Sequence, residues 1–473
     1  MTDTVVTSTS SADMRRSREW TERFLGGGGP PIRFRYDGRE MRGVPAEWHP
    51  VERRRRVDAN IVEIVHEARD PATGLEVRIE AWRYLDFPVV EWTAWFTDRG
   101  GEPTPLIEDI QAIDTAFEGA APVLYHCNGD FYSETGYEPT LTPLSGGQEV
   151  AVAPSGGRPC DQAFPYFRLL FEDAGISLAV GWPAQWAARF TGRAGGVGVV
   201  AGQELTHLRL QPGEAVRTPR ITILSWTGDE ARGINLWRRW YLAHVLPRPD
   251  GRPLAPVLSA AGTDDAEEFT GATEENQLRF IDRFREHGVD FDVWWIDAGW
   301  YPCADPEGHR RWVRTGTWEP DAERFPRGLA PISERVGRGG GRLLLWFEPE
   351  RVTRDSALDR EHPEWLLHIG GPDDQAESVV TSSRLLNLGD GACRQWLTDH
   401  VCRLIEENGI GVYRQDFNFR PLPRWRDNEG VDRQGMGENL HVQGYLRFWD
   451  DLLERNPGLW IDSCSSGGRR NDL

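Results

Sequence analysis

Four apolar segments in the second half of the chain each end in acidic side chains. The acids are Asp297, Glu348 with Glu350, Asp416 and Asp462. Parallel strands of an α/β sheet carry their functional residues at their carboxyl ends, so we expect these side chains to lie together. A group of like charges is costly to bury, and proteins keep such groups to bind a metal or to transfer glycosyl groups.

Glycosyl transfer is the chemistry that the neighbouring residues favour. The 11 histidines supply no ligand beside these acids, so we expect neither a metal nor a cofactor. Trp or Tyr stands beside three of the four acidic segment ends, and aromatic faces can hold a sugar ring. In glycoside hydrolysis one carboxylate attacks the anomeric carbon while a second acid protonates the leaving oxygen.

Asp416 is the expected nucleophile because no other acid adjoins it in the sequence. Arg414 lies two residues earlier, on the same face of the predicted strand, and is expected to keep Asp416 ionised by lowering its pKa. Asn418 is expected to contact the hydroxyl beside the reacting carbon. The alternative is that Arg414 and Asp416 form a buried ion pair with a structural role only.

The elements that position these residues follow an alternating pattern of strands and helices. Five strands with helices between them predict a parallel sheet, most simply about five of the eight units of a (β/α)8 TIM barrel. The predicted strands are 257–261, 289–296, 342–347, 411–415 and 459–462, and the predicted helices are 274–286, 329–338, 393–408 and 440–455.

The first half of the chain has a different pattern, with short alternating segments separated by turn residues. It predicts an antiparallel β-sandwich, so the fold class is a multidomain β and α/β protein. We expect four regions: a flexible N-terminal tail (1–31), the sandwich (32–228), a helical connector (229–253) and the catalytic barrel (254–473), truncated before its sixth strand.

Composition excludes several classes of protein. The 54 basic residues, all of them arginine, face 74 acidic ones, and the net charge of −20 argues against nucleic acid or membrane as a partner. The absence of lysine excludes Schiff-base enzymes and P-loop nucleotide binding. The six cysteines are scattered, no secretory signal precedes the first segments, and no run of about 18 apolar residues occurs, so we expect a cytoplasmic protein.

Four ordered motifs resemble those of the α-galactosidases of glycoside hydrolase family 36, the melibiase family. They are Asp-Ala-Gly-Trp-Tyr (297–301), Trp-Phe-Glu-Pro-Glu (346–350), Tyr-Arg-Gln-Asp-Phe-Asn (413–418) and Cys-Ser-Ser-Gly-Gly-Arg-Arg (464–470). The resemblance implies an N-terminal β-supersandwich, a (β/α)8 barrel and a C-terminal β-domain. It also implies release of terminal α-linked galactose with retention through a covalent glycosyl-Asp intermediate, and family members are often oligomers.

The resemblance also implies roles for individual residues. Asp416 matches the nucleophile, and Asp297 matches the carboxylate that holds galactose hydroxyls 4 and 6. The other implied substrate-binding residues are Trp346, Arg384, Arg414, Asn418, Cys464 and Gly467.

The chain departs from the family pattern at three places. Ala298 stands where the family has a second Asp, and Arg414 stands where it has Lys, so galactose and N-acetylgalactosamine both remain open as substrates. The family's acid/base residue follows the glycine turn on the sixth strand, and we expect it beyond residue 473. Asp472 matches a different, structural aspartate. The 473-residue polypeptide is therefore expected to be inactive and poorly soluble by itself.

Three alternatives to α-galactoside hydrolysis stay open from the sequence. Two share the chemistry: an α-N-acetylgalactosaminidase and a galactosyltransferase similar to raffinose synthases. The third is a carbohydrate-binding protein on a barrel that has lost catalysis, although a binding protein has no need for the residues retained at Asp416 and Asn418.

Overall fold

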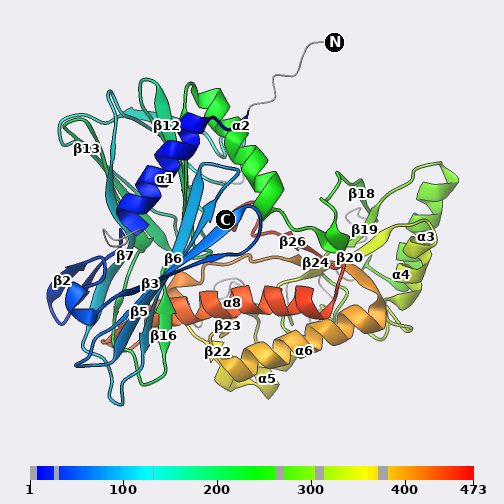
Figure 1. Ribbon diagram of the computed structural model, residues 1–473. Helices are drawn as coiled ribbons and strands as arrows, with labels where there is room; N and C mark the ends of the chain where they lie inside the picture. The colour runs from blue at the N-terminus through cyan, green and yellow to red at the C-terminus, as the bar shows by residue number, and fades with distance from the viewer. Residues whose placement is uncertain (1–7, 26–30, 131–132, 263–270, 304–313, 371–381) are drawn as a thin grey trace, which may run out of the picture. The chain divides into compact units, whose positions relative to one another are not determined.

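The computed structural model describes residues 8–25, 31–130, 133–262, 271–303, 314–370 and 382–473 (Figure 1). The chain divides into two compact units. The first comprises residues 1–246, 429–439 and 469–473, and the second comprises residues 247–428 and 440–468. None of the helices in the described ranges has the length and apolarity that crossing a membrane requires.

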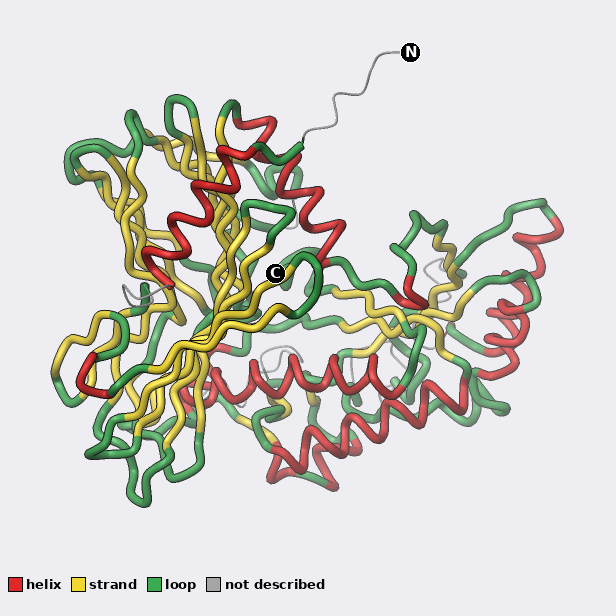
Figure 2. Tube along the Cα trace, in the orientation of Figure 1, coloured by secondary structure: helices red, strands yellow, loops and turns green. Residues whose placement is uncertain are grey.

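Two antiparallel sheets make up most of the first unit, as the sequence predicts (Figure 2). One has the order β10-β13-β14-β7-β1-β2, with β15 and β25 attached, and the other has the order β3-β4-β5-β6-β17-β12-β11-β8-β9, with β16 attached. The first sheet contains β1 (Arg33–Tyr36), β2 (Arg39–Arg42), β7 (Ile107–Glu118), β10 (Glu149–Val152), β13 (Trp186–Arg193), β14 (Gly196–Gln203), β15 (His207–Leu208) and β25 (Arg433–Gln434). The second contains β3 (Val51–Arg56), β4 (Ile61–Arg69), β5 (Leu75–Tyr84), β6 (Val89–Asp98), β8 (Val123–Cys127), β9 (Pro139–Pro143), β11 (Tyr166–Leu170), β12 (Ala174–Gly181), β16 (Ala215–Arg217) and β17 (Arg220–Thr227).

Strand β5 shows why the alternating segments form these sheets. Leu75, Val77 and Ile79 are fully buried on one face, whereas Arg78 and Trp82 on the other face are exposed. Side chains of a strand point alternately to opposite faces, so this spacing buries one complete face of β5 in the core.

The expectation of a flexible tail is wrong for part of residues 1–31. Ser11–Leu25 forms helix α1, which is fixed to the sandwich near its start. Asp13 accepts hydrogen bonds from the Thr227 amide (2.8 Å) and from the Arg232 guanidinium (2.5 Å). Burial alone would raise the pKa of Asp13, but the hydrogen bonds from Arg232 and Ser10 lower it to about 2.

The composition of α1 explains why the sequence pattern did not reveal it. Its buried stripe consists of Asp13, Ser17, Thr21 and Leu25, so three of the four buried residues are polar. An apolar stripe is the usual signal of a packed helix, and this helix lacks one.

The connector forms helix α2 (Glu230–Trp240), which continues as one π-helical turn, η2 (Tyr241–Val245). The Asp229 side chain caps α2 by accepting a hydrogen bond from the Arg232 amide at 2.9 Å. Trp226, Leu236 and Trp240 belong to one buried cluster, so α2 is part of the first unit.

Two segments late in the chain also belong to the first unit. β25 pairs with β15, and Glu438 accepts hydrogen bonds from the Trp182 indole (2.7 Å) and the Gln185 amide (3.0 Å). Near the C-terminus, the Tyr166 hydroxyl donates to the Asp472 carbonyl at 2.9 Å. The unit is therefore discontinuous in sequence, unlike the contiguous ranges that the patterns suggest.

A five-stranded parallel sheet forms the centre of the second unit. Its order is β18-β19-β20-β24-β26, so neighbouring strands follow one another along the chain. The strands are β18 (Ser259–Ala261), β19 (Val293–Ile296), β20 (Arg342–Phe347), β24 (Ile410–Gln415) and β26 (Trp460–Ser463). The helices are α3 (Glu274–Glu286), α4 (Ala330–Gly337), α5 (Ala357–Glu361), α6 (Gly391–Asn408), α7 (Leu422–Asp427) and α8 (Met436–Arg455), and a small antiparallel sheet contains β21 (Arg351–Val352), β22 (Leu366–Leu367) and β23 (Arg384–Leu386).

The two faces of the parallel sheet differ. Trp294, Leu345 and Tyr413 on one face share a core with buried residues of the helices, such as Val401 and Phe448. Val293, Leu344 and Val412 alternate with them and form a separate small cluster, against which Trp295 and Trp460 pack. The helices thus cover one face of the sheet.

Candidate active site

The strand ends of the parallel sheet meet at one edge, as the sequence predicts. Phe347 pairs with Gln415, and Gln415 pairs with Ser463 on the next strand. The residues that follow these three are Glu348, Asp416 and Cys464.

Asp416 is buried, and three donors hold its carboxylate. Oδ1 accepts the amide hydrogens of Phe417 (2.8 Å) and Ser466 (3.2 Å), and Oδ2 accepts the indole hydrogen of Trp346 (3.1 Å). Hydrogen bonds to an ionised carboxylate stabilise it and fix its orientation. Asp416 is therefore a carboxylate with a defined orientation, which a nucleophile requires.

The glycine turn after β26 supplies one of these donors. Ser466 and Gly467 both have a positive φ, of 48° and 96°, which turns the chain sharply. The Ser465 hydroxyl donates to the Phe417 carbonyl at 2.7 Å, and this bond ties the turn to the segment after β24. The turn thereby directs the Ser466 amide at Asp416.

Glu348 forms an ion pair and hydrogen bonds with residues near Asp416. It is fully buried, pairs with Arg351 at 2.5 Å, and accepts a hydrogen bond from the Asn418 amide at 2.5 Å. The Asn418 side chain in turn accepts a hydrogen bond from the Ser466 hydroxyl at 2.6 Å. Burial, together with the charge of Asp416, raises the pKa of Glu348 against the opposing effect of Arg351.

Asp297 and Cys464 lie in the electrostatic field of Asp416. Burial raises the pKa of Asp297, the Asp416 charge adds to this, and the Ala298 amide and Arg414 oppose it. Burial and then the charge of Asp416 raise the pKa of the Cys464 thiol to about 11. Asp297 and Cys464 thus each interact electrostatically with Asp416.

Arg414 forms no ion pair with Asp416 among the described residues, so the alternative of a buried structural pair between them is wrong. Its guanidinium instead forms an ion pair with Asp462, and it lies 4.4 Å from the centroid of the Trp295 ring. The strand register explains this, because Arg414 stands opposite Asp462 on β26. Arg414 contributes to Asp416 and Asp297 only through its charge.

Trp346 is only 1% exposed and belongs to an aromatic cluster. Its ring is roughly parallel to that of Tyr301, with centroids 6.3 Å apart, and its carbonyl accepts the Trp300 indole hydrogen at 2.7 Å. The structure therefore assigns Trp346 a contact with Asp416, whereas its expected role as a wall for the sugar stays a prediction.

A buried polar network supports the strand that carries Asp416. The side-chain nitrogen Nε2 of Gln415 donates to Glu350 at 2.7 Å, and His441 Nε2 lies 2.8 Å from the other Glu350 oxygen. The side-chain oxygen Oε1 of Gln415 accepts hydrogen bonds from the Tyr413 hydroxyl (3.0 Å) and the Trp449 indole (2.7 Å). Glu350, His441, Tyr413 and Trp449 all belong to the second unit.

Arg384 belongs to the small antiparallel sheet, and not to an end of a parallel strand. It lies on β23 of the small antiparallel sheet, where it forms an ion pair with Asp359 and donates to His368 Nδ1 at 3.2 Å. Its role in binding sugar stays a prediction.

The contacts that Ser466 and His441 make had no local signal in the sequence. Ser466 acts through its amide and hydroxyl inside a glycine turn, and His441 reaches Glu350 from α8. The paired acids at 348 and 350 indicated the site, but a single histidine in a helix of mixed composition does not indicate its partner.

A carboxylate held at the carboxyl edge of a parallel sheet, among further buried acids and aromatic rings, is typical of glycoside hydrolases with α/β folds. Comparison with known proteins gives the particular family. Residues 263–473 match the Melibiase family model, and the resemblance to glycoside hydrolase family 36 is confirmed.

The relatives extend the comparison to the rest of the chain. The α-galactosidase AgaA of Geobacillus stearothermophilus is 25% identical over 455 residues, which are 92% of this chain and 58% of AgaA. The α-galactosidase Mel36A of Lactobacillus acidophilus is 26% identical over 266 residues, which are 56% of this chain and 35% of Mel36A. The chain thus spans between about a third and three fifths of the length of these relatives.

Solved structures share the fold. The crystal structure of AgaA has a TM-score of 0.74 at 20% sequence identity, covering 94% of this chain and 62% of AgaA. Variants of AgaA have also been solved in complex with raffinose and with stachyose, with TM-scores of 0.75.

Proposed function

We propose that the protein is a retaining α-galactosidase whose nucleophile is Asp416. The observation that carries this proposal is the Asp416 carboxylate, held by Trp346, Phe417 and Ser466 inside the part of the chain that matches the melibiase family model. These donors orient the carboxylate and leave lone pairs for attack, because an ionised carboxylate has about four acceptor positions.

The reaction proceeds in two displacements. A carboxylate oxygen of Asp416 forms a bond to C1 of the sugar while the bond from C1 to the leaving oxygen breaks, and that oxygen takes a proton from a second carboxyl group. Water then attacks C1, loses its proton to that group, and releases Asp416. Two inversions at C1 give net retention.

The substrates proposed are oligosaccharides with a terminal α-linked galactose. Raffinose and stachyose, the sugars solved with variants of AgaA, are of this kind. Asp297 would accept hydrogen bonds from hydroxyls 4 and 6, and the residues proposed to complete the sugar site are Trp346, Arg384, Arg414, Asn418, Cys464 and Gly467.

We also propose that the parallel sheet is part of a (β/α)8 barrel. Its five strands follow one another in sequence without a reversal of order, whereas a doubly wound sheet reverses. The face opposite the helices carries a small apolar cluster, as the interior of a barrel does. The domain ranges 32–228, 229–253 and 254–473 stay a proposal, except that helix α2 and residues 429–439 and 469–473 belong to the first unit.

The cellular location and the oligomeric state are also proposals. The six cysteines, all without a disulfide, support a cytoplasmic location. Assembly into a homo-oligomer is proposed from the behaviour of the family.

The experiment that tests the nucleophile uses 5-fluoro-α-galactosyl fluoride. Fluoride leaves without a proton from a general acid, so labelling reports on the nucleophile alone. The expected result is a stoichiometric increase in mass, located by peptide mapping on Asp416, and no label in Asp416→Asn. Label on another residue, or none on the folded chain, would reject the assignment and favour a carbohydrate-binding protein without catalysis.

A second measurement concerns the sugar. Ala298 is buried at the position where the family has a second Asp, whose carboxylate would accept a hydrogen bond from a sugar hydroxyl. The missing acceptor keeps an α-N-acetylgalactosaminidase as the alternative. A nitrophenolate leaves without a proton from an acid, so the amounts of nitrophenol that the native chain and Ala298→Asp release from nitrophenyl α-galactoside and from nitrophenyl α-N-acetylgalactosaminide in a first turnover decide between the two sugars. Transfer to sucrose instead of water would indicate a galactosyltransferase.

A further inference from the structure

The side chain of Asn418, two residues after Asp416, is held from both sides within the second unit. Its oxygen Oδ1 accepts a hydrogen bond from the Ser466 hydroxyl at 2.6 Å, and its nitrogen Nδ2 donates to Glu348 Oε2 at 3.4 Å. The backbone amide of Asn418 donates to the other oxygen of Glu348 at 2.5 Å. Both the backbone and the side chain of Asn418 are therefore fixed.

Glu348 decides which way the Asn418 amide is turned. Glu348 is fully buried, and its Oε2 also accepts a hydrogen bond from Arg351 at 2.5 Å. Turning the amide over would place Oδ1 against this carboxylate oxygen, where two acceptors repel each other. A serine hydroxyl can donate or accept, so Ser466 donates to the oxygen that faces it. The carboxylate and the hydroxyl together leave the amide one orientation.

Ser466 contacts the site through its backbone as well as through its side chain. Its φ is 48°, in the left-handed region, and its backbone amide donates to Asp416 Oδ1 at 3.2 Å. The hydroxyl makes a separate contact, with Asn418. A change of the Ser466 side chain can therefore release Asn418 while the donor to Asp416 stays in place.

The hydrogen-bonding positions left on the Asn418 side chain are one donor and one acceptor. An amide group has two N–H hydrogens and two lone pairs on its oxygen, and Glu348 and Ser466 take one of each. Asn418 is partly exposed, so a ligand can reach these positions. A sugar hydroxyl both donates and accepts, and it matches them. The nitrogen of an acetamido group donates without accepting, which leaves the Nδ2 hydrogen unmatched.

We propose that Ser466 is a positioning residue through which the site selects sugars with a free hydroxyl at C2, the carbon beside the reacting C1. The Ser466 hydroxyl keeps the Asn418 amide in the orientation that offers this hydroxyl a donor and an acceptor. Hydrogen bonds to the 2-hydroxyl strengthen in the transition state of glycoside hydrolysis. The inference rests on the function proposed above, and it favours galactose over N-acetylgalactosamine.

The first test measures binding, which does not depend on turnover. The dissociation constants of galactose and 2-deoxygalactose for the whole chain are obtained by ligand-observed NMR titration. The native chain is expected to bind galactose about fivefold more tightly, the usual effect of a hydrogen bond. Ser466→Ala should weaken the binding of galactose by about the same factor and leave that of 2-deoxygalactose unchanged.

Two further variants show whether Ser466 acts through Asn418. Asn418→Ala should remove the preference for galactose, and adding Ser466→Ala to it should cause no further loss, because two residues that act as one unit are not additive. Ser466→Gly also lacks the hydroxyl, and glycine suits the positive φ of this position. It should behave like Ser466→Ala in a turn that stays folded.

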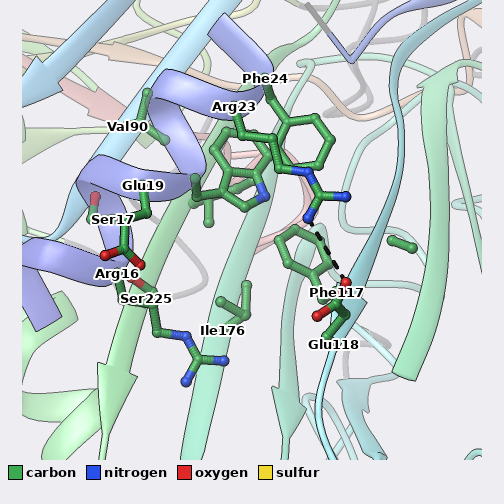
Figure 3. Close-up of a pocket in the computed structure, with 13 residues that line it drawn as sticks. Arg16, Ser17, Glu19, Arg23, Phe24, Val90, Phe117, Glu118, Ile176 and Ser225 are labelled. Atoms are coloured by element: carbon green, nitrogen blue, oxygen red, sulfur yellow. Dashed lines mark ion pairs between the residues drawn. The ribbon is translucent and has the colours of Figure 1, made fainter. Parts of the chain in front are cut away.

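Two serines away from this group serve as matched controls. The Ser333 hydroxyl on α4 donates to the Gly409 carbonyl at 2.7 Å. Ser225 on β17 lines a cavity beside helix α1 in the first unit (Figure 3). Ser333→Ala and Ser225→Ala remove a hydroxyl as Ser466→Ala does, and they should leave the binding of both sugars unchanged.

The second test measures the chemical step. Fluoride release in a first turnover, with the chain in excess, is compared for α-galactosyl fluoride and its 2-deoxy-2-fluoro derivative, since fluoride leaves without a proton from an acid. Relative to the native chain, Ser466→Ala should slow the first reagent about tenfold and the second by less than about twofold.

The two tests separate this inference from the proposed function. Equal binding of both sugars by the native chain, no binding of either, or an equal effect of Ser466→Ala on both sugars or on both reagents would overturn the inference. A preference for galactose that depends on Ser466, in a chain that releases no fluoride, would support the inference and reject the catalytic function.

Discussion

Glu350 and His441 form a buried pair in the second unit, with His441 Nε2 2.8 Å from a Glu350 carboxylate oxygen. Both side chains are at most 1% exposed. The other Glu350 oxygen accepts a hydrogen bond from Gln415, the residue directly before Asp416. A pair from the turn after β20 and from α8 thereby supports the end of the strand that carries the proposed nucleophile.

Breaking this pair should reduce both stability and reactivity. In His441→Ala, a buried carboxylate loses its partner, and the free energy of unfolding should fall by about 3 kcal/mol in urea titrations. The rate at which 5-fluoro-α-galactosyl fluoride labels Asp416 should also fall, because Gln415 is less firmly held. His287→Ala, at an exposed position after α3, should change neither quantity.

The indole of Trp346 should matter through its hydrogen bond and not through its size. Trp346→Phe keeps an aromatic ring but removes the donor to Asp416, and labelling of Asp416 should slow by about tenfold or more. Trp318→Phe is the matched control, because Trp318 is equally buried and its indole nitrogen has no partner among the described residues. Equal rates in the two variants would contradict this role of Trp346.

The stability of the sandwich should depend on acid through Asp13. Its pKa is about 2 in the folded chain and about 3.9 when unfolded, so its stabilisation is fully present above about pH 4 and is lost as the pH falls toward 2. The shift corresponds to about 2.6 kcal/mol of unfolding free energy. Asp13→Asn should remove this part of the pH dependence in urea titrations, whereas the exposed Asp290→Asn should retain it.

Cys464 should report on the charge of Asp416. Its thiol has a pKa of about 11, so alkylation by iodoacetamide should be slow at neutral pH and should accelerate toward pH 11. Asp416→Asn removes a negative neighbour that opposes the thiolate, and the pKa of Cys464 should therefore fall. Mass spectrometry of the Cys464 peptide across a pH series measures both values, and an unchanged profile would place the two groups too far apart to interact.

Periodic segments were predictable wherever local pattern decides structure. The strand at 342–347 and the helix at 393–408 carry apolar residues in sufficient number to indicate their type, and the structure has them as β20 and α6. Helix α1 was not predictable in this way, because its buried stripe is polar and Asp13 depends on partners more than 200 residues away.

The contacts of Arg414 and Asp416 likewise could not be predicted from local pattern. The sequence pointed to Arg414 as the neighbour of Asp416, but the pairing of β24 with β26 places it opposite Asp462. Two of the three donors that hold Asp416 come from β20 and from the turn after β26, and only the folded sheet brings these segments together.

By itself the sequence determined the alternation of the five parallel strands with their helices, the acids at the strand ends and the motifs of the melibiase family. These features depend on the spacing of residues along the chain and on their chemical type. The tertiary structure alone decided which groups hold Asp416, which pair supports Gln415, and that segments near residues 430 and 470 join the first unit. Such contacts depend on register and packing between distant segments, which no local pattern records.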